Sequence, residues 1–267
     1  MTDPQTDTAG SAAATATTPA ATAAERLRLA AESTGRLLHT VAGLKPEAVA
    51  EPSALPGWTR GHVLAHLARN ADSLVNLLNG ARTGTDIPQY ASAEARDQGI
   101  EEGAPRPLDA QLADLRESAE RFAAAAAELP AEAWSAEVRH RAGYTFEAAE
   151  IPWKRLMELE YHHVDLDAGH TPAHWPESFA VAEFHRLAAR LADSAELPPV
   201  ELIADDTEDR ARIGAAPDAP GLTAEGPVRA LAAWLAGRSD GDGLQVHRGG
   251  VQLADARTAL PSLPPLG

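Results

Sequence analysis

Two segments of the sequence place histidine and carboxylate side chains at spacings that suit a divalent metal. The first is GHVLAHLARN, in which His66 lies three residues after Val63 and one before Leu67. The second is RLMELEYHHVDL, in which Glu158 and His162 are four residues apart and therefore share one face of a helix. A histidine from one helix and a Glu/His pair from another give two histidines and one carboxylate. Such a set leaves one tetrahedral position open on Zn²⁺, as catalytic zinc sites do.

Other interpretations of these residues remain open at this point. The same ligands suit Fe²⁺ or Ni²⁺, because ligand type alone does not select the metal. A histidine on an apolar helix face is more often a hydrogen-bonded core residue, and Glu/His spacings of four arise by chance. His62 with His66, or Glu160 or His163 in place of a neighbour, would give alternative sets. We expect His62 and His163 to lie off the inward faces, as surface groups or supports for a ligand.

Helices must bring these side chains together, and the apolar spacing predicts four of them. The first begins near Glu25, the second runs from an N-cap at Thr59 to a stop at Gly80, and the third and fourth cover residues 108–129 and 146–167. Residues 81–107 form a long connection with a short helix over 92–98. Four such helices with one long connection predict a bundle, in which Ile151, Arg155 and Leu166 extend the inward face of Glu158.

The character of the chain changes after residue 167, where AGHTPAHWP is typical of a domain boundary. We expect helices over 176–195 and 227–236 and strands over 200–204, 211–214, 221–224 and 244–247. The predicted fold class is therefore α+β, with a four-helix bundle over 25–168 and a small α+β domain over 175–267. Residues 1–24 are low-complexity Ala, Thr and Pro without the apolar stretch of a secretory signal, so we expect a disordered tail in the cytoplasm.

Composition excludes several classes of function. The 267 residues carry a net charge of -16 and no run of Lys or Arg, which argues against nucleic acid and anionic membranes as partners. We expect a monomer whose ligands are small molecules. The 58 alanines and 12 aromatic residues predict an alanine-rich helical core. The chain has no cysteine, so any thiol chemistry requires a thiol from outside.

The metal-site segments also carry a family resemblance. LPGWTRGHVLAHLARNADSLVNLL followed by MELEYHHVDL resembles the mycothiol-dependent maleylpyruvate isomerase family, a branch of the DinB-like metal-binding helical bundles. The similarity continues through TGTDIPQYASAEARDQGIEEG and LAGRSDGDGL, which covers nearly everything after the tail. It implies zinc, or another divalent metal, on His66, Glu158 and His162. The sequence departs from many relatives at Tyr161 and His163, where they have small or aliphatic residues.

The resemblance further implies an activity. A mycothiol thiolate would add to the cis double bond of maleylpyruvate, the resulting single bond would rotate, and elimination would give fumarylpyruvate in gentisate breakdown. Mycothiol is an actinobacterial thiol, and 21 Arg against two Lys fits a GC-rich genome of that kind. Two alternatives remain: a mycothiol S-transferase that conjugates electrophiles, and a non-catalytic zinc-stabilised binding module.

The resemblance also implies roles for single residues. Arg238, in an AGR motif, would act at the active site, where its planar fork suits a substrate carboxylate. Taken alone, an arginine after Gly237 would more often stabilise the end of a helix. Arg96 is a second candidate for binding substrate. Asp165 is expected to orient a ligand histidine, whereas Asp167 suits a surface position equally well. We expect Trp58 and Trp153 to pack in the core.

Overall fold

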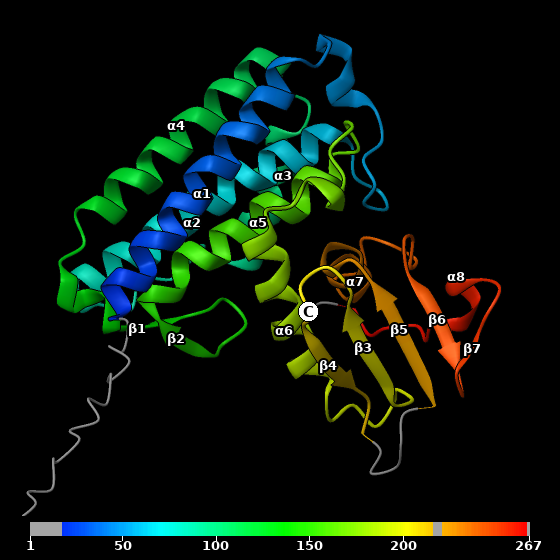
Figure 1. Cartoon of the computed structure of the whole chain (residues 1–267). Coiled ribbons are helices and arrows are strands. Elements are labelled where there is room, and N and C mark those ends of the chain that lie inside the picture. The colour runs from blue at the N-terminus through cyan, green and yellow to red at the C-terminus, as the bar shows by residue number, and fades with distance from the viewer. Residues whose placement is uncertain (1–17, 216–220, 266–267) are drawn as a thin grey trace, which may run out of the picture.

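The computed structural model, which describes residues 18–215 and 221–265, begins with the expected helical bundle (Figure 1). Its long helices are α1 (Pro19–Ala42), α2 (Arg60–Thr83), α4 (Leu108–Ala127) and α5 (Ile151–Asp165). The connection between α2 and α4 contains α3 (Ala93–Gly103), and a hairpin of β1 (Glu137–Arg139) and β2 (Thr145–Glu147) precedes α5. No helix in the described residues is long and apolar enough to cross a bilayer.

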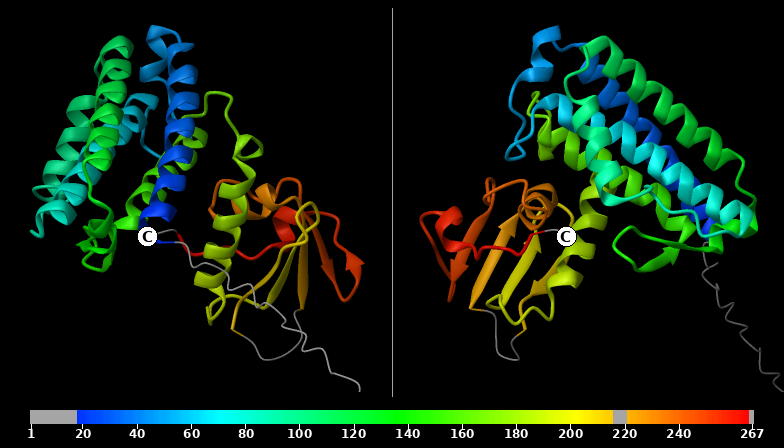
Figure 2. Two further views of the ribbon diagram at one scale, coloured as in Figure 1. Left: turned by 60° about the vertical axis from the view of Figure 1, so that its left-hand side comes forward. Right: turned by 180° about the vertical axis from the view of Figure 1, so that it is seen from behind.

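A mixed five-stranded sheet forms the second part of the structure. Its strands, in the order β4-β3-β5-β6-β7, are β4 (Arg210–Ile213), β3 (Val200–Ala204), β5 (Leu222–Gly226), β6 (Gln245–Arg248) and β7 (Val251–Gln252). Only β3 and β5 are parallel among the pairs described. The helices here are α6 (Glu177–Leu191), α7 (Val228–Leu235) and α8 (Ala256–Ala259). Figure 2 shows α6 between the bundle and the sheet. The fold is α+β, as predicted.

One hydrophobic core runs through both parts. Leu64 and Leu156 of the bundle belong to the same buried cluster as Phe179 and Phe184 of α6 and Leu202 of β3. Alanines of α1 and α2 are also buried, and their small side chains let helices approach closely, as the alanine-rich composition predicts. The bundle and the sheet are therefore packed against each other rather than linked only by the chain.

Helix boundaries differ from three expectations. Helix α1 begins at Pro19 rather than Glu25, because the Thr18 hydroxyl accepts a hydrogen bond from the Ala21 N–H and caps the helix. The predicted disordered tail is thus wrong for residues 19–24, and residues 1–17 lie outside the described residues. Helix α2 continues past Gly80 to Thr83 and is capped by Gly84, whose φ of 69° is left-handed.

The start of α5 was also predicted too early. Residues 145–147 pair as a strand with residues 137–139 instead of forming the first turn of a helix. The helix begins at Ile151, followed by Pro152, whose missing N–H costs nothing in a first turn. The hairpin was missed because three-residue strands leave almost no alternating pattern in the sequence.

A buried carboxylate on α6 fastens this helix to α5. Glu183 has no exposed surface and accepts hydrogen bonds from the indole N–H of Trp153 at 3.1 Å and from the hydroxyl of Tyr161. Its charge is balanced by Arg186 at 2.6 Å. Because Trp153 and Tyr161 belong to α5, Glu183 helps to fix the orientation of the helix that carries Glu158 and His162.

Replacing Glu183 with alanine should therefore destabilise the whole protein. Removing the carboxylate leaves the buried indole N–H of Trp153 and hydroxyl of Tyr161 without their acceptor, and each such loss costs about 1–3 kcal/mol. We expect a loss of that size or more in the free energy of unfolding measured with urea. Glu177→Ala, at an exposed carboxylate of the same helix, is the control and should stay within about 0.5 kcal/mol of the parent. Equal stability of the two variants would contradict this role of Glu183.

Candidate metal centre

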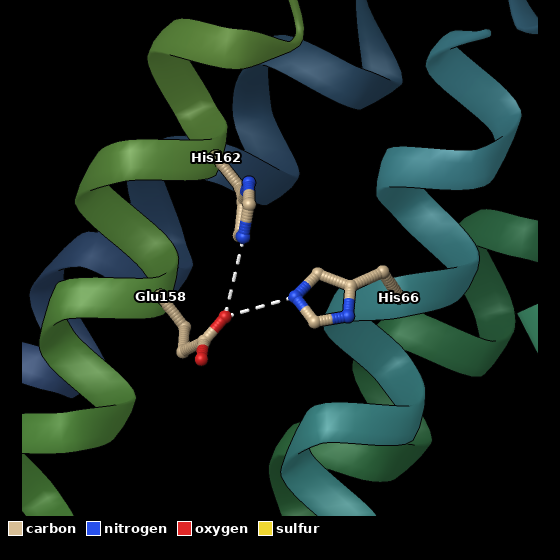
Figure 3. A group of neighbouring side chains, drawn as sticks. All are labelled: His66, Glu158 and His162. Carbon is tan, nitrogen blue, oxygen red and sulfur yellow. Dashed lines mark hydrogen bonds and ion pairs between the residues drawn. The ribbon is translucent and has the colours of Figure 1, made fainter. Parts of the chain in front are cut away.

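Helices α2 and α5 bring His66, Glu158 and His162 to one point (Figure 3). One nitrogen from each histidine and one carboxylate oxygen all lie within 4.8 Å of one another. The Nε2 atoms of His66 and His162 lie 2.8 and 3.3 Å from the same oxygen, Oε2 of Glu158. The two imidazole rings meet nearly at right angles, with their centroids 4.6 Å apart.

Arg155 ties the two helices together beside this point. It is buried on α5, three residues before Glu158, and its Nη1 donates to the carbonyl of Leu67 at 2.8 Å and to Oδ1 of Asn70 at 2.9 Å. Both acceptors lie on α2, within one turn of His66. Burial lowers the pKa of Arg155 to about 10, so the guanidinium stays charged at neutral pH. The predicted inward face of α5 is confirmed at Arg155.

A second carboxylate, that of Asp165, bonds to the ring nitrogen of His162 that does not face Glu158. Asp165 accepts a hydrogen bond from Nδ1 of His162 at 2.9 Å, and it also binds Nη2 and Nε of Arg238 at 2.8 and 3.3 Å. Gly237, with a φ of 69°, ends the turn after α7 that presents Arg238 to the bundle. The sheet domain thereby contributes a cation that holds the orienting carboxylate in place.

Burial and hydrogen bonding shift the pKa values of the three groups in different directions. Burial lowers the pKa of His66. Burial also acts to lower the pKa of His162, but hydrogen bonds to Asp165 and Glu158 outweigh it and raise the value above 6.5. For Glu158, burial is outweighed by its hydrogen bonds to both histidines, and its pKa lies well below 4.5. Without a metal, the site therefore keeps Glu158 ionised and favours the charged form of His162.

The donor set fits a divalent metal. Two imidazole nitrogens and one carboxylate oxygen from two helices are ligands that zinc accepts. In such sites the other ring nitrogen of a ligand histidine usually donates to a supporting carboxylate, which fixes the orientation of the ring. Asp165 gives that support to His162. His66 has none among the described residues, since its buried Nδ1 lacks a hydrogen-bond partner. No fourth His, Asp or Glu joins the group in the described part of the chain.

The residues that would form alternative metal-ligand sets have other partners. His62 completes the N-cap of α2, where its Nδ1 accepts from the backbone N–H of Thr59 at 3.1 Å. Glu160 is buried and bound by Arg36 at 2.7 Å. His163 is buried too, hydrogen-bonded to Thr40 of α1 at 2.8 Å.

The expectation that His163 lies off the inward faces of the helices is therefore wrong. Helix α5 packs against α1 on that side, and the ring of His163 stacks on His170 with centroids 3.6 Å apart. Trp153 is buried as expected, whereas Trp58 is only half-buried and lies against His66, with ring centroids 5.7 Å apart. Asp167 is exposed.

The three candidate ligands line a cavity of about 560 Å³. Six cationic side chains share its wall: Arg96, Arg141, Lys154, Arg186, Arg190 and Arg238. Glu158 is the only carboxylate lining it among the described residues. The sequence singled out Arg96 and Arg238; the other four were missed because nothing in the sequence distinguishes them from exposed arginines and lysines. Arg96 is half-buried and bonded to Asp97 at 2.6 Å.

Similarity to known proteins agrees with this geometry. Residues 30–167, more than half of the chain, match the family model of the mycothiol maleylpyruvate isomerase N-terminal domain. The chain belongs to this family. A crystal structure of mycothiol-dependent maleylpyruvate isomerase is 31% identical, covers 84% of this chain and 92% of its own, and has a TM-score of 0.77. A histidine-to-alanine mutant of such an isomerase matches with the same identity and coverage and a TM-score of 0.76. No curated protein matches the chain.

The similarity of this family member to the solved isomerases extends beyond the bundle. A match over 84% of the chain includes residues outside 30–167, and thus much of the part that carries Arg238.

Metal uptake should release a proton and weaken in acid. The pKa of His162 is raised, so below that pKa Nε2 carries a proton that a metal must displace. The affinity should then fall about tenfold for each pH unit, while Glu158 stays ionised. Calorimetric titration of metal-free protein with Zn²⁺ at about pH 6, below the raised pKa of His162, in two buffers of different protonation enthalpy, measures the released proton. Equal heats in both buffers would contradict the assigned charge state.

Asp165→Asn should weaken the metal without unfolding the protein. Asparagine keeps the shape of the side chain but loses the charge that orients His162, and losing such a support costs about 10–100-fold in metal affinity. Competition with a chelator measures this loss, and circular dichroism checks the fold. Asp167→Asn, two residues away on an exposed side chain, is the matched control. If both variants keep the parent affinity, Asp165 has no role in the metal centre.

Proposed function

We propose that the protein is a mycothiol-dependent cis–trans isomerase that converts maleylpyruvate to fumarylpyruvate, with zinc held by His66, Glu158 and His162. The observation that carries the proposal is the convergence of these three side chains on a cavity lined by six cationic residues. Family membership and the similarity to the two solved isomerase structures support the same activity. We place the reaction in gentisate breakdown in an actinobacterial cytoplasm.

Three ligands from the chain leave one position for an outside group. A bound zinc would lower the pKa of a thiol, so that it attacks as thiolate near neutral pH, adds to the double bond and leaves after rotation. The chain has no cysteine, so this thiol is external and the proposal assigns it to mycothiol. Asp165 keeps Nε2 of His162 directed at the centre by holding Nδ1. The indole of Trp58 lies against the ring of His66, with centroids 5.7 Å apart.

Arg238 is suited to the substrate end nearest His162. A guanidinium has five N–H groups, and Arg238 uses three of them, two on Asp165 and one on the carbonyl of Ala236 at 2.8 Å. Two remain for a substrate carboxylate or for an oxygen that becomes negative during the reaction. Its guanidinium carbon lies 4.7 Å from the ring centroid of Tyr161. Arg96 adds positive charge to the same cavity.

The cationic wall favours the isomerase over the two alternatives. A dianionic substrate gains binding affinity from several cations, whereas an uncharged electrophile in a transferase would not. A binding module with a closed metal site needs a fourth ligand from the protein, and none joins the group among the described residues.

The direct test follows maleylpyruvate by ultraviolet absorbance with mycothiol added and omitted. We expect turnover only with mycothiol, and a loss of more than about 100-fold in kcat/KM for His66→Ala, Glu158→Ala and His162→Ala, beyond the usual cost of losing a supporting residue. His185→Ala, an exposed histidine of α6, is the control. Thiol-independent turnover, or activity in the three variants, would contradict the proposal. Thiol consumption with other electrophiles but no isomerisation would identify a transferase.

A further inference from the structure

Lys154 lies on the same face of α5 as two of the candidate metal ligands. Residues 154, 158 and 162 are spaced by four, so each step advances about 6 Å along the helix axis. All three line the cavity. Lys154 is therefore one turn beyond Glu158, on the side away from His162.

The ammonium group of Lys154 has no carboxylate partner in the described part of the chain. It donates to the hydroxyl of Tyr144 at 3.0 Å and lies over the rings of Phe146 at 4.4 Å and Tyr144 at 5.2 Å. Glu158, at the spacing of a helical ion pair, turns to the histidines instead. An ammonium has three N–H donors, so two of Lys154 remain for a ligand.

Most of the other cations in the cavity are already paired. Arg96 binds Asp97, Arg186 binds Glu183 and Arg238 binds Asp165. Arg190 is exposed, and its Nη2 donates to the carbonyl of Pro265 at 3.3 Å.

The β1–β2 hairpin adds, close to Lys154, a further cation without a carboxylate partner among the described residues. The side chain of Arg141 is exposed, with no carboxylate bonded to it among the described residues, and its backbone N–H is held by Gln89 at 2.8 Å. His140 stacks on Tyr144 with ring centroids 4.5 Å apart. Burial, and then the charges of Lys154 and Arg141, lower the pKa of His140 to about 4. His140 is therefore neutral at pH 7, and the positive charge here comes from Lys154 and Arg141.

We infer that Lys154, supported by Arg141, binds the second carboxylate of a dianionic substrate whose first carboxylate lies toward Arg238. Arg238 lies over Tyr161, and positions 154 and 161 of α5 are seven residues apart, about 10 Å along the helix axis. The seven-carbon chain of maleylpyruvate, with C–C bonds of about 1.5 Å, spans a comparable distance between its outer carboxylate oxygens. This subsite selects dianions over monoanions of the same length, and it rests on the proposed function for the identity of the substrate.

Binding of pimelate and heptanoate tests the subsite without turnover. The first is a saturated seven-carbon dianion and the second its monoanionic counterpart. Calorimetry on the zinc-loaded protein should show at least tenfold tighter binding of pimelate, since a hydrogen bond to a charged group contributes that much or more. In Lys154→Met, the ratio of the two affinities should fall toward one. Methionine preserves the apolar contact with the hairpin rings, so the hairpin should stay packed.

Two variants provide the controls. Lys154→Arg keeps the charge and should retain the preference for pimelate. Lys45→Met changes the other lysine of the chain, which is exposed, and should behave as the parent. For maleylpyruvate, Lys154→Met should raise KM about tenfold or more, with kcat changed less than about threefold.

The outcomes separate this inference from the proposed function. Parent protein without a preference for pimelate, or an unchanged preference in Lys154→Met, overturns the subsite. Isomerisation with an unchanged KM in Lys154→Met also overturns it and leaves the proposed function intact. If pimelate binding depends on Lys154 but maleylpyruvate is not isomerised, the subsite stands and the proposed function fails.

Discussion

Glu158 is a half-buried carboxylate on the wall of the cavity, and two imidazoles from two helices keep it ionised by hydrogen bonding to the same oxygen. Burial alone would disfavour the charged form, so the contact between α2 and α5 must hold His66 against Glu158. Arg155 bonds the two helices beside that contact, and Glu183 fastens α5 to α6. Asp165 and Arg238 then extend the chain of charges into the sheet domain. The bundle and the sheet are therefore both needed to build one polar centre.

The distribution of charge explains how an acidic protein could hold an anionic substrate. With a net charge of -16, the protein as a whole repels dianions. The cavity reverses this locally, because six cations and one carboxylate line it. Arg96, Arg186 and Arg238 are paired with carboxylates, whereas Lys154, Arg141 and Arg190 have no carboxylate partner among the described residues. Of these three, only Lys154 lies on α5 beside Glu158. The absence of cysteine similarly directs thiol chemistry to an external molecule.

Sequence patterns predicted what regular helices determine and missed what tertiary contacts determine. The spacing of Glu158 and His162 placed them on one face, and an inward stripe on α2 identified His66, so the cluster could be found before the structure. His163 was misplaced because its burial depends on α1, which no local pattern reveals. The β1–β2 hairpin is too short to leave a periodic signal. Lys154 acquires its importance from rings on that hairpin, so sequence reasoning had no basis for selecting it.

X-ray absorption at the zinc edge tests the central claim most directly, because the protein contains two methionines and no cysteine. The purified, zinc-loaded protein should show only nitrogen and oxygen neighbours, including two imidazoles. Adding mycothiol should introduce one sulfur neighbour at about 2.3 Å, the length of a zinc–thiolate bond. That sulfur can come only from the external thiol bound at the open position. A first shell that already contains four protein ligands, or that shows no sulfur with saturating mycothiol, would contradict the account.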